Sequence, residues 1–436
     1  MTKFLYLLMI LSFMVALGGC NDSEDISVPK HTPTYSVKMG GIFPFTGALS
    51  EKGKPRHQAA LLAIDHLNEA GFSVGWAVAD SETNPEIGVK VARELIEKGK
   101  VQILIGAASS GVTTAIVENV SLPNQIPQIS YASTSSAITT LEPEQDFGCG
   151  DGNSDFVFRT TPSDTLQGEV LAQLALEKYR FLSVLYVDNS YGKSLSKIFK
   201  EHFESLGGTV IAMEPHEDVV TSVTEGGESY LEQLEKAYAV NAEALVAISY
   251  FRHVNVYIPE AINKNLFHEF IFVGGSKSQE LAETIKPKDS LEGMCGTAPG
   301  VDYSKPSYEA FKREYNDKYQ DGKPDIWDKP NTYDAVVIAG LAAYAVQASG
   351  ESITPTAIRD YLRCVNDPDG EKVIAGAENL KLAMKMLDSG LAINYEGASG
   401  NVDFDENGDV VTPIQIWCFK DGKIEHRETV QPDVSD

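Results

Sequence analysis

Basic side chains are scarce in this chain. Its 436 residues include 36 lysines and arginines against 62 aspartates and glutamates, which gives a formal net charge of −26 at pH 7. We expect no nucleic acid partner, because phosphate binding needs a basic face. The common nucleotide, zinc-protease and dithiol motifs (G-x-x-x-x-G-K-[ST], H-E-x-x-H, C-x-x-C) do not occur. We therefore expect neither a cofactor nor a metal.

Long apolar runs occur only at the N-terminus. Residues 4–17 are fourteen mostly apolar residues. This length fits a secretory signal and is too short for a membrane-spanning helix, which needs about 20 residues. The following residues, Leu17-Gly18-Gly19-Cys20, resemble the bacterial lipobox, in which the cysteine is acylated and becomes the first residue. The alternative is an ordinary cleavage site with a chance cysteine.

The N-terminal pattern predicts the location of the protein. We expect a signal peptide over 1–19, a lipid on Cys20 and a polar tether over 20–35. The chain would then be exported and held on a bacterial membrane by its lipid alone, facing the periplasm or the exterior. The length of the remaining chain predicts two domains.

Four cysteines remain after Cys20, at positions 149, 295, 364 and 418. No two of them lie within a few residues of each other, and no histidine stands near them at metal-site spacing. An even number in an exported protein predicts two disulfides. Four buried free thiols are the alternative.

Strands and helices alternate from residue 36 onward. Strand candidates at 36–43, 74–80, 101–106 and 126–132 are separated by helical segments, and the same order restarts at residue 156. Later strand candidates are 181–189, 244–249, 269–275 and 291–299, and helices are expected over about 306–319, 331–348, 354–364 and 376–388. This alternation predicts an α/β fold of parallel sheets with helices on both faces. The late return of helices indicates that the chain crosses between two lobes more than once.

Serine-rich loops follow two successive strands. GAASSG (106–111) opens a helix, and YASTSS (131–136) follows the next strand. A helix N-terminus with serine hydroxyls suits a ligand carboxylate, and loops after parallel strands face one crevice. Simple helix capping by Ser109 or Ser110 is an alternative. A further alternative is a hydrolase nucleophile at Ser109, with His253 or His268 as the base.

The segment from Asp403 to Gly408 matches the first half of a calcium-binding loop. The twelfth position, however, is Ile414, where such a loop needs a bidentate glutamate. We interpret the segment as a turn.

The order of these motifs resembles the type I periplasmic binding proteins of the leucine/isoleucine/valine-binding group, which serve ABC importers. The resemblance covers about residues 36 to 430. It rests on GGIFPFTG (40–47) with a helix ending in NEAG, ILIGAASS, ISYASTSS, VFRTTPSD, VLYVDNSYGKSL, FVGGSKS, EGMCGTAPG and YEGASGNVDFDENGDV.

The resemblance implies two doubly wound lobes joined by three crossing strands. Lobe one would comprise 36–158 plus 298–402, and lobe two 159–297 plus 403–430. The strands crossing near residues 160, 297 and 403 would form a hinge. This division suggests the disulfides Cys149–Cys364 and Cys295–Cys418.

The resemblance also implies a binding site. Ser109 and Ser110, together with Ala132, Ser133 and Thr134, would hold a carboxylate. Tyr191 would close over the ligand, with Tyr250 or Phe251 as a further wall. Amino-acid-binding relatives carry an acid where this chain has Ser276 and Lys277, and often an aromatic residue where it has Lys52. Asp188 is the candidate that would substitute for the missing acid.

The implied function is that of a solute-binding lipoprotein rather than an enzyme. It would act as a monomer and capture an amino acid, amide or carboxylate for the permease of an ABC importer. The alternatives are a serine hydrolase using Ser109 and a ligand-sensing lipoprotein not coupled to transport.

Overall fold

A five-stranded parallel sheet forms the first lobe. The computed structural model describes residues 35–142, 155–218, 229–287, 289–320 and 328–431. In the first sheet the strand order is β2-β1-β3-β4-β5, and every pair is parallel. The strands are β1 (Val37–Phe43), β2 (Val74–Asp80), β3 (Ile103–Ile105), β4 (Gln128–Ser130) and β5 (Val157–Arg159).

Helices cover both faces of the first sheet. Ile103 and Ile105 of β3 point into one apolar cluster and Leu104 into another, as alternation along a strand requires. α1 and α12 pack on the first face, and α2 and α3 on the second. The early helical segments are η1 (Ser50–Lys52), α1 (Gly53–Ala70), α2 (Pro85–Glu97), α3 (Ser110–Ile116), the π-helical η2 (Val117–Ser121), α4 (Leu122–Asn124) and α5 (Ser136–Thr139).

Capping residues and glycine define the ends of two of these helices. The Asn84 side chain accepts hydrogen bonds from the backbone N–H groups of Glu86 and Ile87, and Pro85 occupies the first turn of α2. α1 ends at Gly71, whose φ of 109° is the left-handed conformation that glycine adopts readily.

A seven-stranded sheet forms the second lobe. Its strand order is β14-β13-β10-β9-β8-β6-β7. The strands are β6 (Phe181–Val187), β7 (Thr209–His216), β8 (Ala244–Ile248), β9 (Phe270–Phe272), β10 (Cys295–Pro299), β13 (Ile414–Lys420) and β14 (Lys423–Val430). Its helical segments are α6 (Asp164–Leu176), α7 (Ser190–Ser205), α8 (Leu231–Ala237), α9 (Phe251–Asn263), η3 (Gly274–Ser276) and α10 (Gln279–Thr284).

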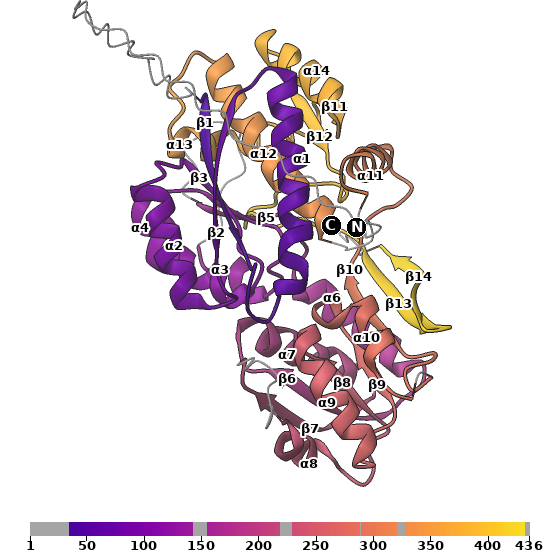
Figure 1. Ribbon diagram of the computed structural model, residues 1–436. Helices are drawn as coiled ribbons and strands as arrows, with labels where there is room; N and C mark the ends of the chain where they lie inside the picture. The colour runs from indigo at the N-terminus through magenta and orange to yellow at the C-terminus, as the bar shows by residue number, and fades with distance from the viewer. Residues whose placement is uncertain (1–34, 143–154, 219–228, 288, 321–327, 432–436) are drawn as a thin grey trace, which may run out of the picture. The chain divides into compact units, whose positions relative to one another are not determined.

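The second sheet is mixed, which qualifies the expected parallel arrangement. β13 pairs antiparallel with β10 and with β14, while β6 to β10 run parallel. The hairpin β13–β14, drawn in yellow, lies beside β10 in Figure 1. It is antiparallel because a two-residue turn joins its strands, and parallel strands need a longer crossover.

The chain returns to the first lobe after β10. α11 (Pro306–Tyr319), α12 (Lys329–Ala348), α13 (Pro355–Tyr361) and α14 (Ala377–Asp388) follow. α12 and α14 pack on α1, so the orange and indigo helices lie together in Figure 1. A small parallel pair, β11 (Glu371–Ile374) and β12 (Ile393–Glu396), was not expected from the sequence.

Two lobes with α/β architecture therefore confirm the predicted fold class. The first sheet uses strands from residues 37–159, and the second uses strands from 181–299 and 414–430. The exact lobe boundaries and the hinge role of the three crossings stay predictions. No helix among the described residues is both long enough and apolar enough to span a membrane.

One predicted disulfide is confirmed. Cys295 and Cys418 are bonded and stand opposite each other on the antiparallel strands β10 and β13. Cys364 also takes part in a disulfide. Cys149 lies outside the described residues, so the pairing Cys149–Cys364 stays a prediction.

Candidate functional site

A cavity lies where loops of the two lobes meet. It contains about 390 Å³ of space not occupied by protein atoms. The first lobe contributes loops and helix starts that follow β1, β3 and β4, and the second contributes segments that follow β6, β8 and β9. The lining residues are Leu49, Lys52, Arg56, Ala108, Ser110, Ala132, Thr134, Gln167, Tyr191, Tyr250, Gly274, Gly275 and Pro299.

The serine-rich loops supply part of this lining. Ser110, Ala132 and Thr134 line the cavity, whereas Ser109 and Ser133 are not among the lining residues. The Ser133 hydroxyl lies 2.8 Å from that of Thr113 and 3.2 Å from the carbonyl of Ala107, so it holds the loop together. Ser109 occupies the N-cap position of α3, but its side chain makes no capping hydrogen bond.

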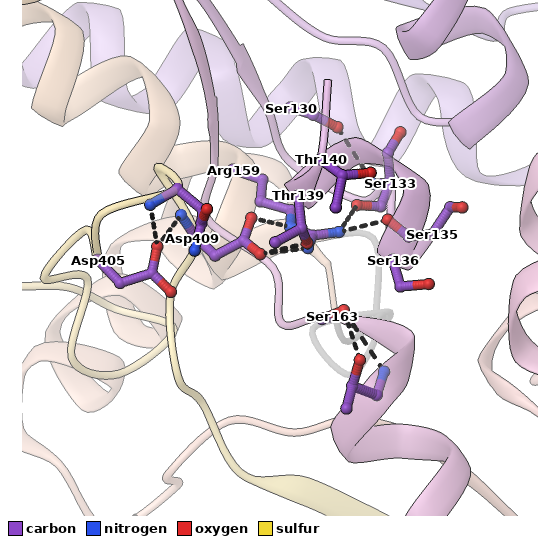
Figure 2. A network of polar contacts seen from close by, with 12 residues as sticks. Ser130, Ser133, Ser135, Ser136, Thr139, Thr140, Arg159, Ser163, Asp405 and Asp409 are labelled. Carbon is purple, nitrogen blue, oxygen red and sulfur yellow. Dashed lines mark hydrogen bonds and ion pairs between the residues drawn. The ribbon is translucent and has the colours of Figure 1, made fainter. Parts of the chain in front are cut away.

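Arg159 holds the loop that carries Ala132 and Thr134. Its guanidinium donates to the carbonyls of Ser133, at 3.3 Å, and Ser135, at 2.9 Å. It also pairs with the Asp409 carboxylate and donates to the Thr139 hydroxyl. Figure 2 shows these bonds converging on the guanidinium from the loop and the helix turn after it. A side chain from β5 thereby fixes a loop that follows β4.

The turn that begins at Asp403 carries the ion-pair partner of Arg159, which is Asp409. Its Asp405 carboxylate accepts hydrogen bonds from the backbone N–H groups of Asn407 and Asp409, both at 2.9 Å, which closes a tight turn (Figure 2). The turn aims Asp409 at the guanidinium. The interpretation of this segment as a turn is therefore confirmed.

Two stacked tyrosines form the wall from the second lobe. The rings of Tyr191 and Tyr250 are 5.6 Å apart at an interplanar angle of 9°. Asn189 donates to the Tyr250 hydroxyl at 3.0 Å. A Cβ on Gly275 would lie 3.2 Å from Tyr191, so glycine lets the ring approach this backbone closely. Burial raises the pKa of both phenols, so both remain neutral hydrogen-bond donors at neutral pH.

Other predicted residues lie away from the lining. Phe251 begins α9 and packs into the main apolar cluster. The Ser276 hydroxyl donates to the carbonyl of Val273 at 2.9 Å. Lys277 donates to the Gln415 side chain at 2.9 Å. Asp188 pairs with Lys193 at 2.7 Å on a largely exposed surface, so it does not replace a site acid.

A buried carboxyl near the cavity is Asp164 at the start of α6. Its backbone N–H donates to the carbonyl of Thr134 at 2.6 Å, and its side chain is fully buried. Burial raises the pKa of Asp164 to about 6, against the opposing effect of the Thr134 and Ser194 hydroxyls. Sequence reasoning noted this residue only within the VFRTTPSD motif.

Lys52 and Arg56 are charged lining residues to which the sequence analysis assigned no role. Both are nearly fully buried. Lys52 donates to the carbonyl of Gly274, in the second lobe, at 3.1 Å. Arg56 pairs with Asp328 and lies 5.8 Å from the centre of the Tyr131 ring. The sequence did contain a pattern that indicates burial of Arg56. This residue precedes the buried Ala60 and Leu67 by four and eleven positions, so all three lie on the apolar face of α1.

The geometry around Ser109 does not form a hydrolytic triad. Its hydroxyl lies 3.4 Å from that of Tyr250. Among the described residues no histidine is hydrogen-bonded to it. His253 faces Asp218 at 3.6 Å within the second lobe, and His268 bonds the exposed Asn265. A serine nucleophile needs a base within hydrogen-bond reach, so the hydrolase alternative is not favoured.

Comparison with known proteins agrees with this geometry. Residues 36–416 match the family model described as periplasmic binding protein. The chain is 27% identical over 405 residues to the chemotactic signal transduction system substrate-binding protein BasB of Halobacterium salinarum, covering 91% of this chain and 90% of that one. It is 24% identical over 384 residues to the leucine-, isoleucine-, valine-, threonine- and alanine-binding protein of Pseudomonas aeruginosa, covering 86% and 87%.

A solved structure shows the same fold. The leucine-binding protein LivK of Thermotoga maritima superposes with a TM-score of 0.71 at 22% identity, covering 91% of this chain and 99% of that one. The family match spans most of the chain and includes every residue that lines the cavity. The chain belongs to the type I periplasmic binding protein family.

Proposed function

We propose that this chain captures a small ligand bearing a carboxylate outside the cytoplasm and delivers it to the permease of an ABC importer. The observation that carries the proposal is the convergence of hydroxyl groups from Ser110 and Thr134 with the Tyr191 ring on one cavity. Hydroxyl and backbone N–H donors favour a carboxylate, and an aromatic wall excludes water from it. The similarity to binding proteins for small amino acids supports a ligand of this size.

The movement that accompanies capture follows from the lobe division. The lobes contact each other at the cavity rim, where Ser135 donates to the carbonyl of Ser190 at 3.1 Å and Ser194 accepts from the N–H of Ser136 at 2.9 Å. Bending at the three crossing segments would break these contacts and open the cavity. A ligand that touches both lobes would favour the closed form.

A thermal-shift screen of the purified protein against small metabolites tests the proposal. A ligand at 100 times its dissociation constant adds about 2.7 kcal/mol to the free energy of unfolding. We expect a shift with a carboxylate-bearing compound and no turnover of a chromogenic ester. Ester hydrolysis that disappears in Ser109→Ala would replace the proposal with the hydrolase alternative.

Sensing is the second candidate function, and the similarity to the chemotactic BasB protein favours it. Uptake of the labelled screening hit separates the two. Cells lacking this chain lose uptake if it serves an importer. They keep uptake and lose only the cellular response to the hit if it serves a sensor.

The lipid anchor on Cys20 is a further part of the proposal. It is motivated by the lipobox directly after the short apolar run. Replacing Cys20 by Ala and the signal by that of a non-lipoprotein should move the protein from the membrane fraction to the soluble fraction. Recovery from cells of an intact, unmodified Met1 terminus would refute the anchor without affecting ligand capture.

A further inference from the structure

Two buried cations lie on the cavity wall, one turn of helix apart. The exposed fraction is 4% for Lys52 and 2% for Arg56, and both residues line the cavity. Lysine and arginine are almost never fully buried unless paired. It therefore matters whether other groups of the protein provide enough acceptors and negative charge for both side chains, or whether a ligand must do so.

Within the part of the chain that the structure describes, both side chains have N–H groups without a hydrogen-bond partner. Arg56 uses Nε and Nη2 for Asp328, while among the described residues its buried Nη1 has no hydrogen-bond partner. The Lys52 ammonium donates to the Gly274 carbonyl. Its nearest carboxylate, that of Glu51, is 3.9 Å away and outside hydrogen-bond distance. Unsatisfied buried donors cost free energy.

The charge at this wall is also unbalanced. Asp328 offsets Arg56, but Glu51 does not fully offset Lys52, because burial raises the pKa of Glu51 to about 7 and leaves it largely neutral in mildly acidic solution. Burial also lowers the pKa of Lys52. An anion placed against Lys52 and Nη1 of Arg56 would satisfy both donors and favour the charged lysine.

The number of donors exceeds the capacity of one carboxylate. A carboxylate offers about four acceptor positions. The Lys52 ammonium has about two unused N–H groups and Arg56 Nη1 has about two more, so together they occupy all the acceptor positions of one carboxylate. The hydroxyls and backbone N–H groups around Ser110 and Thr134, which follow different strands, are then left for another group. This count rests on the proposed function, in which those residues hold a carboxylate.

We infer that Lys52 and Arg56 form a subsite for a second acidic group, so that the ligand is a small molecule with two acidic groups, such as a dicarboxylate. Ligands with an apolar tail would leave Nη1 of Arg56 and the remaining N–H groups of Lys52 buried without a hydrogen-bond acceptor. They would therefore bind less well than diacids of similar size.

Isothermal titration calorimetry with matched pairs tests the inference. Each pair joins a diacid with its monoamide, which has nearly the same shape but lacks one charge. The pairs are aspartate and asparagine, glutamate and glutamine, succinate and succinamate, and glutarate and glutaramate. We expect at least one diacid to bind, and to bind about 10- to 150-fold more tightly than its amide, as expected for a charge-assisted hydrogen bond.

Lys52→Met removes the charge at nearly constant size. It should weaken binding of that diacid by about 10-fold or more while leaving the amide little changed. Lys54→Met is the matched control, because Lys54 is exposed in the same turn of α1 and should preserve the preference for the diacid. Circular dichroism of each variant checks folding.

Three results would overturn the inference. They are equal affinity for both members of every pair, an unchanged preference in a folded Lys52→Met variant, and no binding of any diacid. If leucine or another monoacid binds tightly while the diacids do not, the proposed capture function stands and only the diacid subsite fails. If no compound of the broad screen binds, the proposed function itself fails.

Discussion

Arg159 and Asp409, 250 residues apart in the sequence, form a buried ion pair beneath the loop that carries the candidate carboxylate site. The guanidinium belongs to the last strand of the first sheet, and the carboxylate to the turn at the final crossing between lobes. The pair therefore links the position of the serine-rich loop to the path of the chain between the lobes.

Breaking this pair should be strongly destabilising. Arg159→Leu leaves Asp409 buried without its cation and frees the Ser133 and Ser135 carbonyls. We expect a loss of about 3–5 kcal/mol in the free energy of unfolding, measured by urea denaturation. Arg427→Leu is the control, because Arg427 pairs with Glu177 on the surface and its loss should cost less than about 1 kcal/mol. Equal losses in both variants would contradict the assigned role of Arg159.

Ligand affinity should depend on Thr134 and Tyr191. Thr134→Ala removes a hydroxyl from the cavity, and Tyr191→Ala removes the ring that covers it. Each change should weaken binding of the screening hit by about 1–3 kcal/mol, measured by calorimetry. Thr140→Ala, which alters an exposed hydroxyl bonded to the carbonyl of Ala137, should leave affinity unchanged. A hit whose affinity neither site variant alters does not bind at this site.

The Asp164 carboxyl should make stability depend on pH. Its pKa is about 6 in the folded chain against an ordinary value of 3.8 for an aspartate, so the folded state holds the proton more tightly. Its contribution therefore becomes less favourable as pH rises from about 4 to 6 and is constant above that. Asp164→Asn should gain stability relative to wild type across this window, measured by melting temperatures from pH 4 to 8. Thr140→Ala, which removes an exposed hydroxyl and no titratable group, is the control, and its difference from wild type should not vary with pH. A pH-independent difference for Asp164→Asn would refute the assignment.

Loss of the Cys295–Cys418 disulfide should destabilise the second lobe. The bond spans 123 residues, and the chain-entropy model assigns about 4–5 kcal/mol to a loop of this length, less any strain. The double variant Cys295→Ser/Cys418→Ser should unfold at a correspondingly lower urea concentration. Peptide mapping without reduction would identify this pair in the wild type and would also test Cys149–Cys364. Unchanged stability in the double variant would contradict the prediction.

Sequence patterns predicted most of the sheets, because strands buried on both faces are continuous apolar runs. Ile103–Ile105 and Ala244–Ile248 are fully buried and stand out for this reason. β11 was missed because it is short and contains Glu371 and Lys372, which are exposed. The antiparallel part of the second sheet depends on which strands become neighbours, and the spacing of residues does not encode that.

The candidate site was predicted in part for a similar reason. Ser110, Thr134 and Tyr191 follow strands directly, so the topology brings them together. Lys52 and Arg56 were not assigned to the lining because charges near a turn are usually solvated. The buried guanidinium of Arg56 is stabilised by the carboxylate of Asp328, which lies 272 residues further along the chain. Only the folded structure shows that contact.

The disulfide also has a topological consequence. Cys295 and Cys418 stand on either side of the segment that leaves the second lobe, builds α11 to α14 in the first and returns. The covalent bond closes this excursion into a ring. A protease that cuts once within 300–413 would therefore leave a single molecule, whose two fragments separate only after reduction. Such a nicked chain would keep both strands of the β10–β13 pair tethered, so the second sheet would retain its register.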